Sequence, residues 1–374
     1  MWPFLRILIQ ELSMRVLHVI LTPRYSGAEI LVRDLARIDA EQGHDVAIIA
    51  LNPSEPEFEC EVSGLQAIGV DWFLPKAPLR RVGRLYFLRR WVKEFRPEVI
   101  AAHTAIPSLY ARIALLCVDV PIVSVLHAVN DYGVVKLAWM ERLFRHKASV
   151  IASVSQLGLQ NYVSQVGGQG LMRFLPNGID SSRFLKALTS RERYRADWGL
   201  KEPSYVVIQV GRIDSVKRQH LSLKATLPLF AEHPGLMLWF VGLVEDSNYY
   251  KYLRNLIAEY GCEDRVEFFG SRSDVPQLLS AADLFLMPSA WESQGIAYLE
   301  GLASGLPVIA SNISVFSFAK ALPGATLLDP ENTAKFSDAI RTFIRVRKRY
   351  DRNMQQFSIY KTANAYHQIF KEII

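Results

Sequence analysis

Residues 283–311 read DLFLMPSAWESQGIAYLEGLASGLPVIAS, and this stretch decides the fold. Its apolar start, residues 283–287, is followed by a Pro-Ser pair, which is typical of a buried strand that ends in a turn. Gly295 can open a helix, and residues 305–307 (Gly-Leu-Pro) end it before a second apolar run. The stretch therefore predicts a strand, a sharp turn, a helix and a second strand, which is the repeating unit of a parallel α/β sheet.

Two carboxylates bracket this turn, with Glu292 before the helix and Glu300 inside it. Such a turn presents free backbone N–H groups and the positive end of a helix to an anion. The two carboxylates can then accept hydrogen bonds from hydroxyls on either side of that anion. A nucleotide sugar has this layout, because its diphosphate lies between ribose hydroxyls and sugar hydroxyls. The alternative is a solvated pair of glutamates beside an ordinary α/β unit.

The spacing of the pair favours the first interpretation. Glu292 and Glu300 have seven residues between them and are followed by Gly-Leu-Pro-Val-Ile at 305–309, and together these features resemble the Glu-x7-Glu motif of retaining GT-B glycosyltransferases of family 4. The resemblance covers residues 14–374 and is stronger in the second half. It implies an α/β fold in which two Rossmann-like domains face each other across a cleft and the C-terminal helix returns to the first domain.

The resemblance also divides the chain by role. Residues 1–183, with the returning helix at 353–374, are expected to form an acceptor-binding domain. Residues 184–352 are expected to bind the nucleotide sugar. A chain of 374 residues suits two domains, and a composition of 50% hydrophobic and 21% charged residues is globular. Three cysteines without metal-like spacing fit a reduced cytoplasm.

Positive charge is concentrated between residues 76 and 96, although the net charge of the chain is only +6. The segment carries eight basic residues against the single acid Glu94, and apolar residues recur between them at helical spacing. A basic amphipathic helix of this kind suits an anionic membrane surface, here through residues 80–96. A helix with one packed face and one solvated basic face fits equally well. Nucleic acid is not expected as a partner, because no other binding motif accompanies the charge.

No stretch of the sequence is long and apolar enough to span a bilayer. Residues 1–13 lack the features of a signal peptide, and Met14 begins the first predicted strand directly. The first thirteen residues are interpreted as an upstream extension or a weak amphipathic anchor. A cytoplasmic protein, peripheral on the inner face of the cell membrane, is the expected localisation.

The first strand and helix, Arg15–Leu21 and Ile30–Glu41, are joined by a turn that contains Gly27. The turn has no Gly-x-Gly-x-x-Gly pattern, so it is not a dinucleotide fingerprint. Family 4 enzymes usually hold a Gly-Gly pair here, whose backbone approaches the donor phosphate. Gly27 is therefore a predicted donor contact, and Ser26 in place of the first glycine is expected to narrow that approach through its Cβ.

Two predicted strands end in histidine, residues 96–103 at His103 and residues 121–127 at His127. Ligands of open α/β sheets bind at the carboxyl ends of strands, so both side chains are candidates for the site. In the family the second such histidine lies by the donor sugar, which implies a role at the reaction centre for His127. His103 is a second candidate, for the acceptor. A histidine at a strand end can also be a satisfied loop residue.

The second half begins with the strand Tyr205–Val210, which leads to Gly211, Arg212 and Lys217. In the family the equivalent Arg and Lys bind the donor diphosphate, whose leaving group gains negative charge as the glycosidic bond breaks. Surface charges on an ordinary loop are the alternative. No Asp-x-Asp occurs in the chain, so no metal ion is expected at the diphosphate, and no cofactor is expected.

The resemblance assigns the remaining donor contacts. Ser271 follows a strand whose turn lies near the base. Glu300 takes the ribose hydroxyls, and Glu292 holds the donor sugar with the backbone of Gly295 and Ile296. Ser293 and Gln294 depart from the residues that many relatives carry at these positions, so the sugar stays unnamed.

The function implied is retaining transfer of a hexose from a UDP- or GDP-sugar to a hydroxyl of a lipid-linked glycan or glycolipid, in bacterial cell-surface polysaccharide biosynthesis. The resemblance implies same-face attack, in which an oxygen of the departing phosphate accepts the acceptor's proton. Two alternatives stay open. The first is a soluble enzyme of the same fold that makes a small glycoside or disaccharide phosphate, or a phosphorylase, although no motif for the pyridoxal phosphate lysine of a phosphorylase stands out. The second is a non-catalytic module that only binds the nucleotide sugar.

Overall fold

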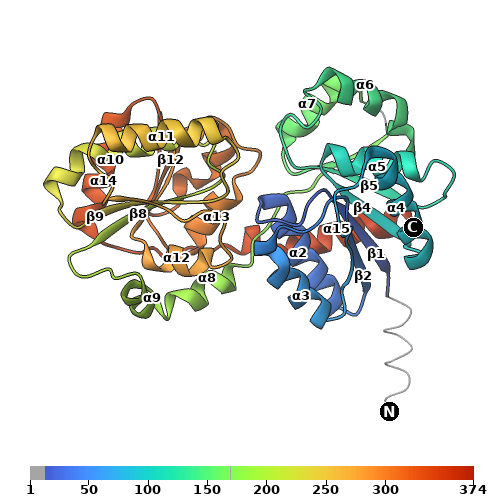
Figure 1. Ribbon diagram of the computed structural model, residues 1–374, viewed down its shortest axis with the longest axis horizontal. Coiled ribbons are helices and arrows are strands. Elements are labelled where there is room, and N and C mark those ends of the chain that lie inside the picture. The colour runs from blue at the N-terminus through green and yellow to red at the C-terminus, as the bar shows by residue number, and fades with distance from the viewer. Residues whose placement is uncertain (1–12, 169) are drawn as a thin grey trace, which may run out of the picture. The chain divides into compact units, whose positions relative to one another are not determined.

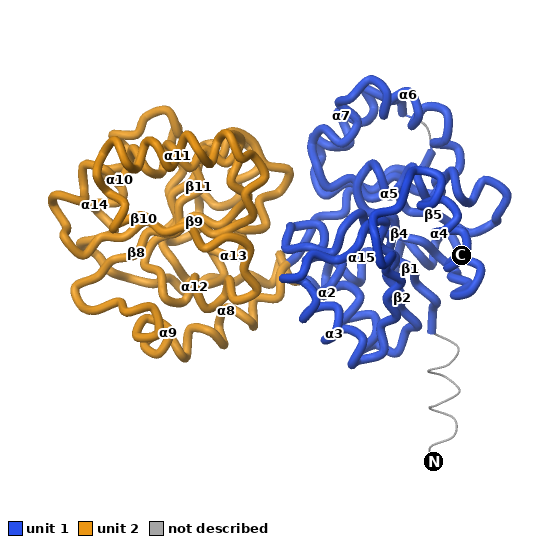
Figure 2. The backbone as a smooth tube through the Cα atoms, in the orientation of Figure 1, with its two compact units in different colours: residues 1–178, 359–374 blue, residues 179–358 orange. Residues whose placement is uncertain are grey.

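The computed structural model describes residues 13–168 and 170–374, which form two compact units (Figure 2). Unit 1 comprises residues 1–178 and 359–374, and unit 2 comprises residues 179–358. The boundaries thus fall at 178/179 and 358/359, where the sequence placed them at 183/184 and 352/353. The interpretation of residues 1–13 as an extension or an anchor lies, apart from Ser13, outside the described residues.

Unit 1 is built on a parallel sheet of seven strands in the order β3-β2-β1-β4-β5-β6-β7. The strands are β1 (Arg15–Ile20), β2 (Asp45–Ala50), β3 (Asp71–Phe73), β4 (Val99–His103), β5 (Ile122–Leu126), β6 (Val150–Ser153) and β7 (Leu171–Phe174). The residues of β4, β5 and β6 are all buried, as expected for strands covered on both faces. All their carboxyl ends lie at one edge, because the strands are parallel.

Helices cover both faces of this sheet (Figure 1). One layer contains α2 (Gly27–Glu41), α3 (Glu59–Ala67) and α15 (Ile359–Ile373), and the other contains α4 (Arg81–Phe95), α5 (Ala105–Ala114), α6 (Val135–Phe144) and α7 (Gln156–Val166). The hydroxyl of Ser155 caps α7 by accepting from the backbone N–H of Gly158 at 3.0 Å. Among the described residues, no helix has the length and apolar character needed to cross a membrane.

The C-terminal helix α15 completes the core of unit 1. Its buried residues Ala363 and Phe370 belong to the same apolar cluster as Leu35 and Ile38 of α2. The helix begins at residue 359 and follows a short 3-10 turn, Gln355–Phe357, so the predicted returning segment is present but starts later than residue 353. The last residues of the chain are therefore part of the fold that carries His103 and His127.

Unit 2 contains a parallel sheet of six strands in the order β10-β9-β8-β11-β12-β13. The strands are β8 (Tyr205–Val210), β9 (Leu236–Val241), β10 (Val266–Phe268), β11 (Leu284–Met287), β12 (Val308–Ser311) and β13 (Ala325–Leu328). Helices α10 (Gln219–Glu232), α11 (Ser247–Glu259) and α14 (Thr333–Val346) pack on one face, and α8 (Ser181–Leu188), α9 (Arg191–Asp197), α12 (Val275–Ala281) and α13 (Ile296–Ala303) pack on the other. The strand–helix–strand unit predicted from residues 283–311 is β11-α13-β12.

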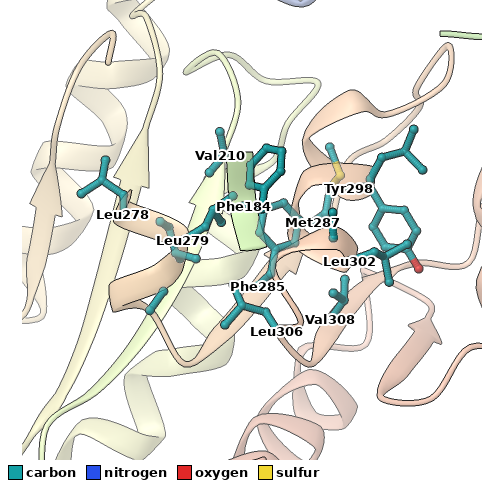
Figure 3. Close-up of a cluster of buried hydrophobic side chains, with 14 of the residues drawn as sticks. Phe184, Val210, Leu278, Leu279, Phe285, Met287, Tyr298, Leu302, Leu306 and Val308 are labelled. Carbon is teal, nitrogen blue, oxygen red and sulfur yellow. The ribbon is translucent and has the colours of Figure 1, made fainter. Parts of the chain in front are cut away.

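One apolar cluster in unit 2 packs α8, α12 and α13 against the sheet (Figure 3). Phe285 of β11 and Leu302 of α13 are both buried in it, next to Phe184 of α8. Gly301 allows this contact, because a Cβ there would lie 2.8 Å from the ring of Phe285. Helix α13 is thereby fixed close to the strand that precedes it, with its N-terminus at the carboxyl edge of the sheet.

A buried ion pair joins α5 to α6 in unit 1. The guanidinium of Arg112 donates to both carboxylate oxygens of Glu141 at 2.5 Å, and both side chains are completely buried. The hydroxyl of Tyr162 also donates to Glu141, at 2.7 Å. Burial acts to lower the pKa of Arg112, but the interactions with Tyr132 and Glu141 raise it above its ordinary value, so the guanidinium is charged.

Glu141→Gln should lower the free energy of unfolding by about 3 kcal/mol, because it leaves the guanidinium of Arg112 buried without a counter-charge. Chemical denaturation of the full chain measures this change. Glu41→Gln is the matched control, since it removes the exposed Arg37–Glu41 pair and should change the free energy by at most about 0.5 kcal/mol. Equal effects of the two substitutions would contradict the assignment.

Candidate active site

Three glycines follow three neighbouring strands at the carboxyl edge of the sheet in unit 2. Gly211 follows β8, Gly242 follows β9 and Gly270 closes the turn after β10, with φ values of 153°, 148° and 65°. A Cβ on Gly242 would lie 2.1 Å from the carbonyl oxygen of Gly211. The two loop backbones therefore approach so closely that position 242 requires glycine.

Buried polar side chains hold the loop from Gly211 to Arg218 in place. Gln209 donates to the carbonyl of Lys217 at 2.7 Å, and Gln219 donates to the carbonyl of Arg212 at 2.8 Å. Ser222 in turn donates to Gln209 at 2.7 Å. The sequence interpretation did not identify these residues, although a glutamine within the apolar strand Tyr205–Val210 was a signal for them. The two predicted cations thus sit on a fixed backbone.

Lys217 and Glu292 form an ion pair within unit 2. The ammonium group of Lys217 donates to Oε1 of Glu292 at 2.5 Å, and the side chains are 15% and 8% exposed. The two turns that carry them are also tied through the backbone, because Ala290 N–H donates to the carbonyl of Val216 at 2.8 Å. Two residues predicted separately from distant motifs are therefore in direct contact.

Arg212 is held more loosely than Lys217. Its guanidinium lies 3.4 Å from a carboxylate oxygen of Asp214 and 3.9 Å from one of Glu245, and its side chain is 39% exposed. Asp214 is engaged elsewhere, since its Oδ1 accepts from the backbone N–H groups of Val216 and Lys217 at 2.9 and 3.0 Å. An arginine with two long contacts can turn towards an incoming anion at small cost.

The turn after β11 leads into α13 as the sequence predicted. Gly295 precedes the helix with φ 76° and ψ 63°, and a Cβ there would lie 2.5 Å from the ring of Phe316. Ile296 is the first residue of α13, and Glu300 is half-buried one turn further on. Ser289, which the sequence interpretation did not single out, is buried, and its hydroxyl has no hydrogen-bond partner in the described part of the chain.

Ser271 lies at the next turn along the sheet edge, after Gly270. Its hydroxyl is buried and has no hydrogen-bond partner among the residues that the structure describes. The neighbouring Arg272 donates to both carboxylate oxygens of Asp274, at 2.7 and 2.6 Å, and its guanidinium lies 5.6 Å from the ring of Trp198. Arg272 is thus committed to its own turn, whereas the neighbouring hydroxyl of Ser271 is buried without such a contact.

In unit 1 the two predicted histidines are in contact. Nε2 of His127 lies 3.0 Å from Nδ1 of His103, and Nε2 of His103 lies 3.0 Å from Nδ1 of His18 on β1. Burial lowers the pKa of His127 to about 4, and burial together with the two neighbouring rings lowers that of His103 well below its ordinary value. The rings of His103 and His127 are therefore uncharged at neutral pH.

His103 has a different environment from the one expected of an acceptor contact. The residue is 1% exposed, and both ring nitrogens lie within hydrogen-bond distance of other histidines. His127 is half-buried. The geometry thus favours a place for His103 behind His127 over direct contact with an acceptor.

Asp131 shapes the turn that carries His127, and the sequence interpretation did not identify it. Its Oδ2 accepts from the backbone N–H of Ala128 at 2.9 Å. Burial raises the pKa of this carboxyl to about 6, against the opposing effect of backbone N–H groups from Ala128, His127 and Ala105. An acid four residues beyond the strand end was the available signal, since such residues often bond to a preceding backbone.

Gly27 is the first residue of α2 and is exposed. Its backbone is not among those with positive φ, so the turn does not use the conformational freedom of glycine. The hydroxyl of Ser26 donates to the carboxylate of Glu29 in the first turn of the helix. The Cβ of Ser26 lies directly before the N-terminus of α2, where it was expected to narrow the approach of the donor phosphate to the backbone. Across the described residues, no group of three or more side chains could hold a metal ion.

Two protein-family models together match most of the chain. The model for glycosyl transferases group 1 matches residues 190–357, and the model for glycosyltransferase family 4 matches residues 25–183. The chain is a family 4 glycosyltransferase of GT-B fold. The two matched segments correspond to unit 2 and to most of unit 1.

Curated relatives of this glycosyltransferase include a galactosyltransferase and a glucosyltransferase. The UDP-Gal:alpha-D-GlcNAc-diphosphoundecaprenol alpha-1,3-galactosyltransferase of Escherichia coli is 26% identical over 81% of this chain and 80% of its own length. The lipopolysaccharide glucosyltransferase WaaG of Escherichia coli is 31% identical over 45% of this chain and 46% of its own length. Among solved structures, HepE of Anabaena in complex with UDP-glucose superposes with a TM-score of 0.79 over 96% of this chain and 100% of its own, and at 20% identity this likeness shows the fold.

Gly242→Ala in the glycosyltransferase should lower the free energy of unfolding by about 3 kcal/mol, because its Cβ meets the carbonyl of Gly211. Gly270→Ala is the matched control. Gly270 also has positive φ, but a Cβ there meets nothing within 4 Å, so only about 1 kcal/mol of backbone strain is expected. Denaturant unfolding of both variants measures the two free energies. A larger loss in Gly242→Ala than in Gly270→Ala would show that the close contact between the two loops, and not only the positive φ, requires glycine at 242.

Proposed function

We propose that this enzyme transfers a sugar, with retention and without a metal ion, from a UDP- or GDP-sugar to a hydroxyl of a lipid-linked glycan or glycolipid at the cytoplasmic face of the membrane. The observation that carries the proposal is the contact between Lys217 and Glu292 on a rigid loop beside Arg212. In this contact Lys217, which was predicted to bind the diphosphate, meets Glu292, which was predicted to bind the sugar.

The chemistry of the donor fits this group of side chains. As the glycosidic bond breaks, the nucleoside diphosphate gains negative charge, which Lys217 and Arg212 stabilise in place of a metal ion. Lys217 is neutralised by Glu292 in their ion pair. A bound diphosphate replaces that carboxylate as the partner of Lys217, and Glu292 is released to accept hydrogen bonds from hydroxyls of the sugar. Glu300 on α13 takes the ribose hydroxyls.

Retention is proposed to proceed by attack on the same face that the leaving group departs from. The acceptor hydroxyl loses its proton to the departing phosphate oxygen, so the new bond forms where the old one breaks. The carboxylate assigned to the donor sugar, Glu292, is paired with a lysine, which suits hydroxyl binding better than nucleophilic attack. His127 contributes a neutral imidazole from unit 1 at the reaction centre.

The proposed acceptor class rests on the relatives. The matched galactosyltransferase acts on a diphosphoundecaprenol-linked sugar, and WaaG is a lipopolysaccharide glucosyltransferase. A lipid-linked acceptor requires the enzyme to work at a membrane surface. A soluble enzyme that makes small glycosides remains the alternative, and screening lipid-linked against water-soluble acceptors separates the two.

Helix α4 supplies mainly positive charge to such a surface. Its apolar residues Leu88, Val92 and Phe95 are buried in the core of unit 1. The basic residues on its other side are exposed, and they are Arg81, Arg89, Arg90 and Lys93, with Arg80 and Arg96 at its ends. Val82 and Tyr86 near the start of the helix are 62% and 73% exposed, so the outer face combines positive charge with two apolar side chains.

Helix α6 supplies the exposed apolar area. Val135, Trp139 and Leu143 follow one another at intervals of one turn and are 85%, 61% and 51% exposed. Lys136 and Arg142 are exposed beside them, whereas the acid of this helix, Glu141, is buried in its pair with Arg112. An apolar ridge with basic flanks is suited to insertion among anionic lipid headgroups.

Donor binding tests the site. UDP- or GDP-sugars should raise the melting temperature of the wild type, since a ligand of the folded state stabilises it. Arg212→Met and Lys217→Met should abolish this shift and lower kcat/KM at least about 100-fold. Arg193→Met, at a side chain that is 80% exposed in unit 2, is the control and should leave both unchanged.

The product of the same assay tests the mechanism. NMR of the first product should show the anomeric configuration of the donor, and EDTA should leave the rate unchanged. Normal turnover in both Arg212→Met and Lys217→Met would refute the donor site. An inverted product would refute retention, and loss of activity in EDTA that Mg²⁺ restores would refute metal independence.

Membrane binding is expected to depend on α6 and α4 in different ways. Trp139→Ser/Leu143→Ser should lower binding to phosphatidylglycerol-containing vesicles at least about tenfold, because the apolar ridge is lost. Arg89→Glu/Arg90→Glu should lower binding to these vesicles at low salt. Flotation assays measure both, with Leu185→Ser in unit 2, which is 58% exposed, as the control. Binding equal to the wild type in both double variants would refute the proposed surface.

A further inference from the structure

A line of buried polar side chains runs behind His127 through unit 1. It passes from His127 to His103 and His18, then to Asp39 on α2, and ends at His367 on α15. His18, Asp39 and His103 are 1%, 2% and 1% exposed. Five separate elements each place one member in the line, and the donor site in unit 2 uses none of them.

The two N···N distances of 3.0 Å restrict the tautomers of the three histidines. In each contact one nitrogen must carry the proton and the other must offer its lone pair, since two lone pairs or two protons would repel at this distance. A neutral imidazole carries one proton. The line His18–His103–His127 therefore has two uncharged states, one with every proton on Nε2 and one with every proton on Nδ1.

Asp39 distinguishes the two states. Its Oδ2 lies 3.6 Å from Nε2 of His18, and its Oδ1 lies 2.7 Å from Nε2 of His367. Although burial acts to raise the pKa of Asp39, its interactions with His18 and His367 lower it overall, so the carboxyl is ionised. At 3.6 Å the contact with His18 is longer than a hydrogen bond, but a proton on Nε2 is attracted to the carboxylate and a lone pair is repelled.

We propose that Asp39, acting through His18 and His103, fixes His127 in the Nε2–H tautomer and so leaves its Nδ1 as a hydrogen-bond acceptor. Asp39 selects Nε2–H in His18, whose Nδ1 then accepts from Nε2–H of His103, whose Nδ1 in turn accepts from Nε2–H of His127. Nδ1 of His127 has no hydrogen-bond partner within the described chain. Asp39, His18 and His103 are thus positioning residues.

The consequence for the reaction rests on the proposed function of His127. A hydroxyl of the donor sugar or of the acceptor can donate its hydrogen to Nδ1, and its oxygen is then oriented by that bond. In the opposite tautomer His127 would present an N–H, and the same hydroxyl would have to rotate and accept. The C-terminal helix takes part as well, because His367 holds the second oxygen of Asp39.

Nitrogen NMR of the full-length enzyme labelled with ¹⁵N-histidine tests the proposal, because protonated and unprotonated ring nitrogens differ in chemical shift. The wild type should show His18, His103 and His127 with protons on Nε2, and a coupling across each N–H···N bond. A charge-assisted contact biases the tautomers about tenfold or more, so at most about a tenth of His127 should be in the opposite form. A proton on Nδ1 of His127 in the wild type would overturn the proposal.

Variants separate this arrangement from a purely structural role. Asp39→Asn removes the charge, and His18→Leu cuts the line while it leaves the contact between Asp39 and His367 in place. In either variant both tautomers of His127 should become visible, with kcat/KM about tenfold lower. His103→Gln should retain activity, since an amide can donate to His18 and accept from His127, whereas His103→Leu should not.

The outcomes distinguish this inference from the proposed function. If Asp39→Asn and His18→Leu both leave His127 entirely in the Nε2–H form, the inference is refuted, whatever the activity. If the tautomers mix but transfer and donor binding are unchanged, the inference holds and the role proposed for His127 fails. Should Asp39→Asn not fold, His18→Leu decides the question alone.

Discussion

The donor side of this enzyme depends on one close approach between two backbones. Gly242 passes the carbonyl of Gly211 so closely that a Cβ would lie 2.1 Å from its oxygen. This fixes the start of the loop that carries Arg212 and Lys217, and the amides of Gln219 and Gln209 fix the carbonyls of those two residues. With the backbone fixed from inside, binding of an anion requires only an exchange of side-chain partners. In the proposed donor site the ion pair between Lys217 and Glu292 is the contact that is exchanged, on a backbone that is already fixed.

In unit 1, side chains rather than backbone contacts position the residue proposed at the reaction centre, His127. His127 follows the last residue of β5, and its ring is positioned by the histidines behind it and by the turn around Asp131. The order in that line derives from a single ionised carboxylate, Asp39, which two histidines flank. Because one of them, His367, belongs to α15, the returning helix has a chemical role besides its packing on α2. The fold connects the end of the chain to the side chain proposed at the reaction centre.

Much of this arrangement followed from the sequence, because parallel sheets place the ends of their strands at one edge. The predicted strand ends put His103 close to His127, and they put Arg212 and Lys217 on the edge that carries Glu292. The contact between Lys217 and Glu292 was not predictable in detail, since 75 positions separate the two residues and no local pattern reports that distance. Gln209, His18 and Asp39 were missed for another reason. Gln209 and His18 are single polar residues in apolar strands, and Asp39 is one of several charged residues of α2, so the sequence pattern does not name the partner of any of them.

Helix α4 shows a second limit of predictions from periodicity. A repeat of apolar residues shows that a helix has two faces, but not which face another element covers. In α4 the apolar face packs into the core through Leu88 and Val92. In α6 the arrangement is reversed, because the acid Glu141 is buried by its pair with Arg112 and the large apolar Trp139 faces outwards. The buried pair thus fixes an orientation of α6 that exposes apolar area, and the proposed insertion among lipid headgroups offsets the cost of that exposure. Helix α5 contacts both α4 and α6, so the basic face and the apolar ridge belong to one layer of unit 1.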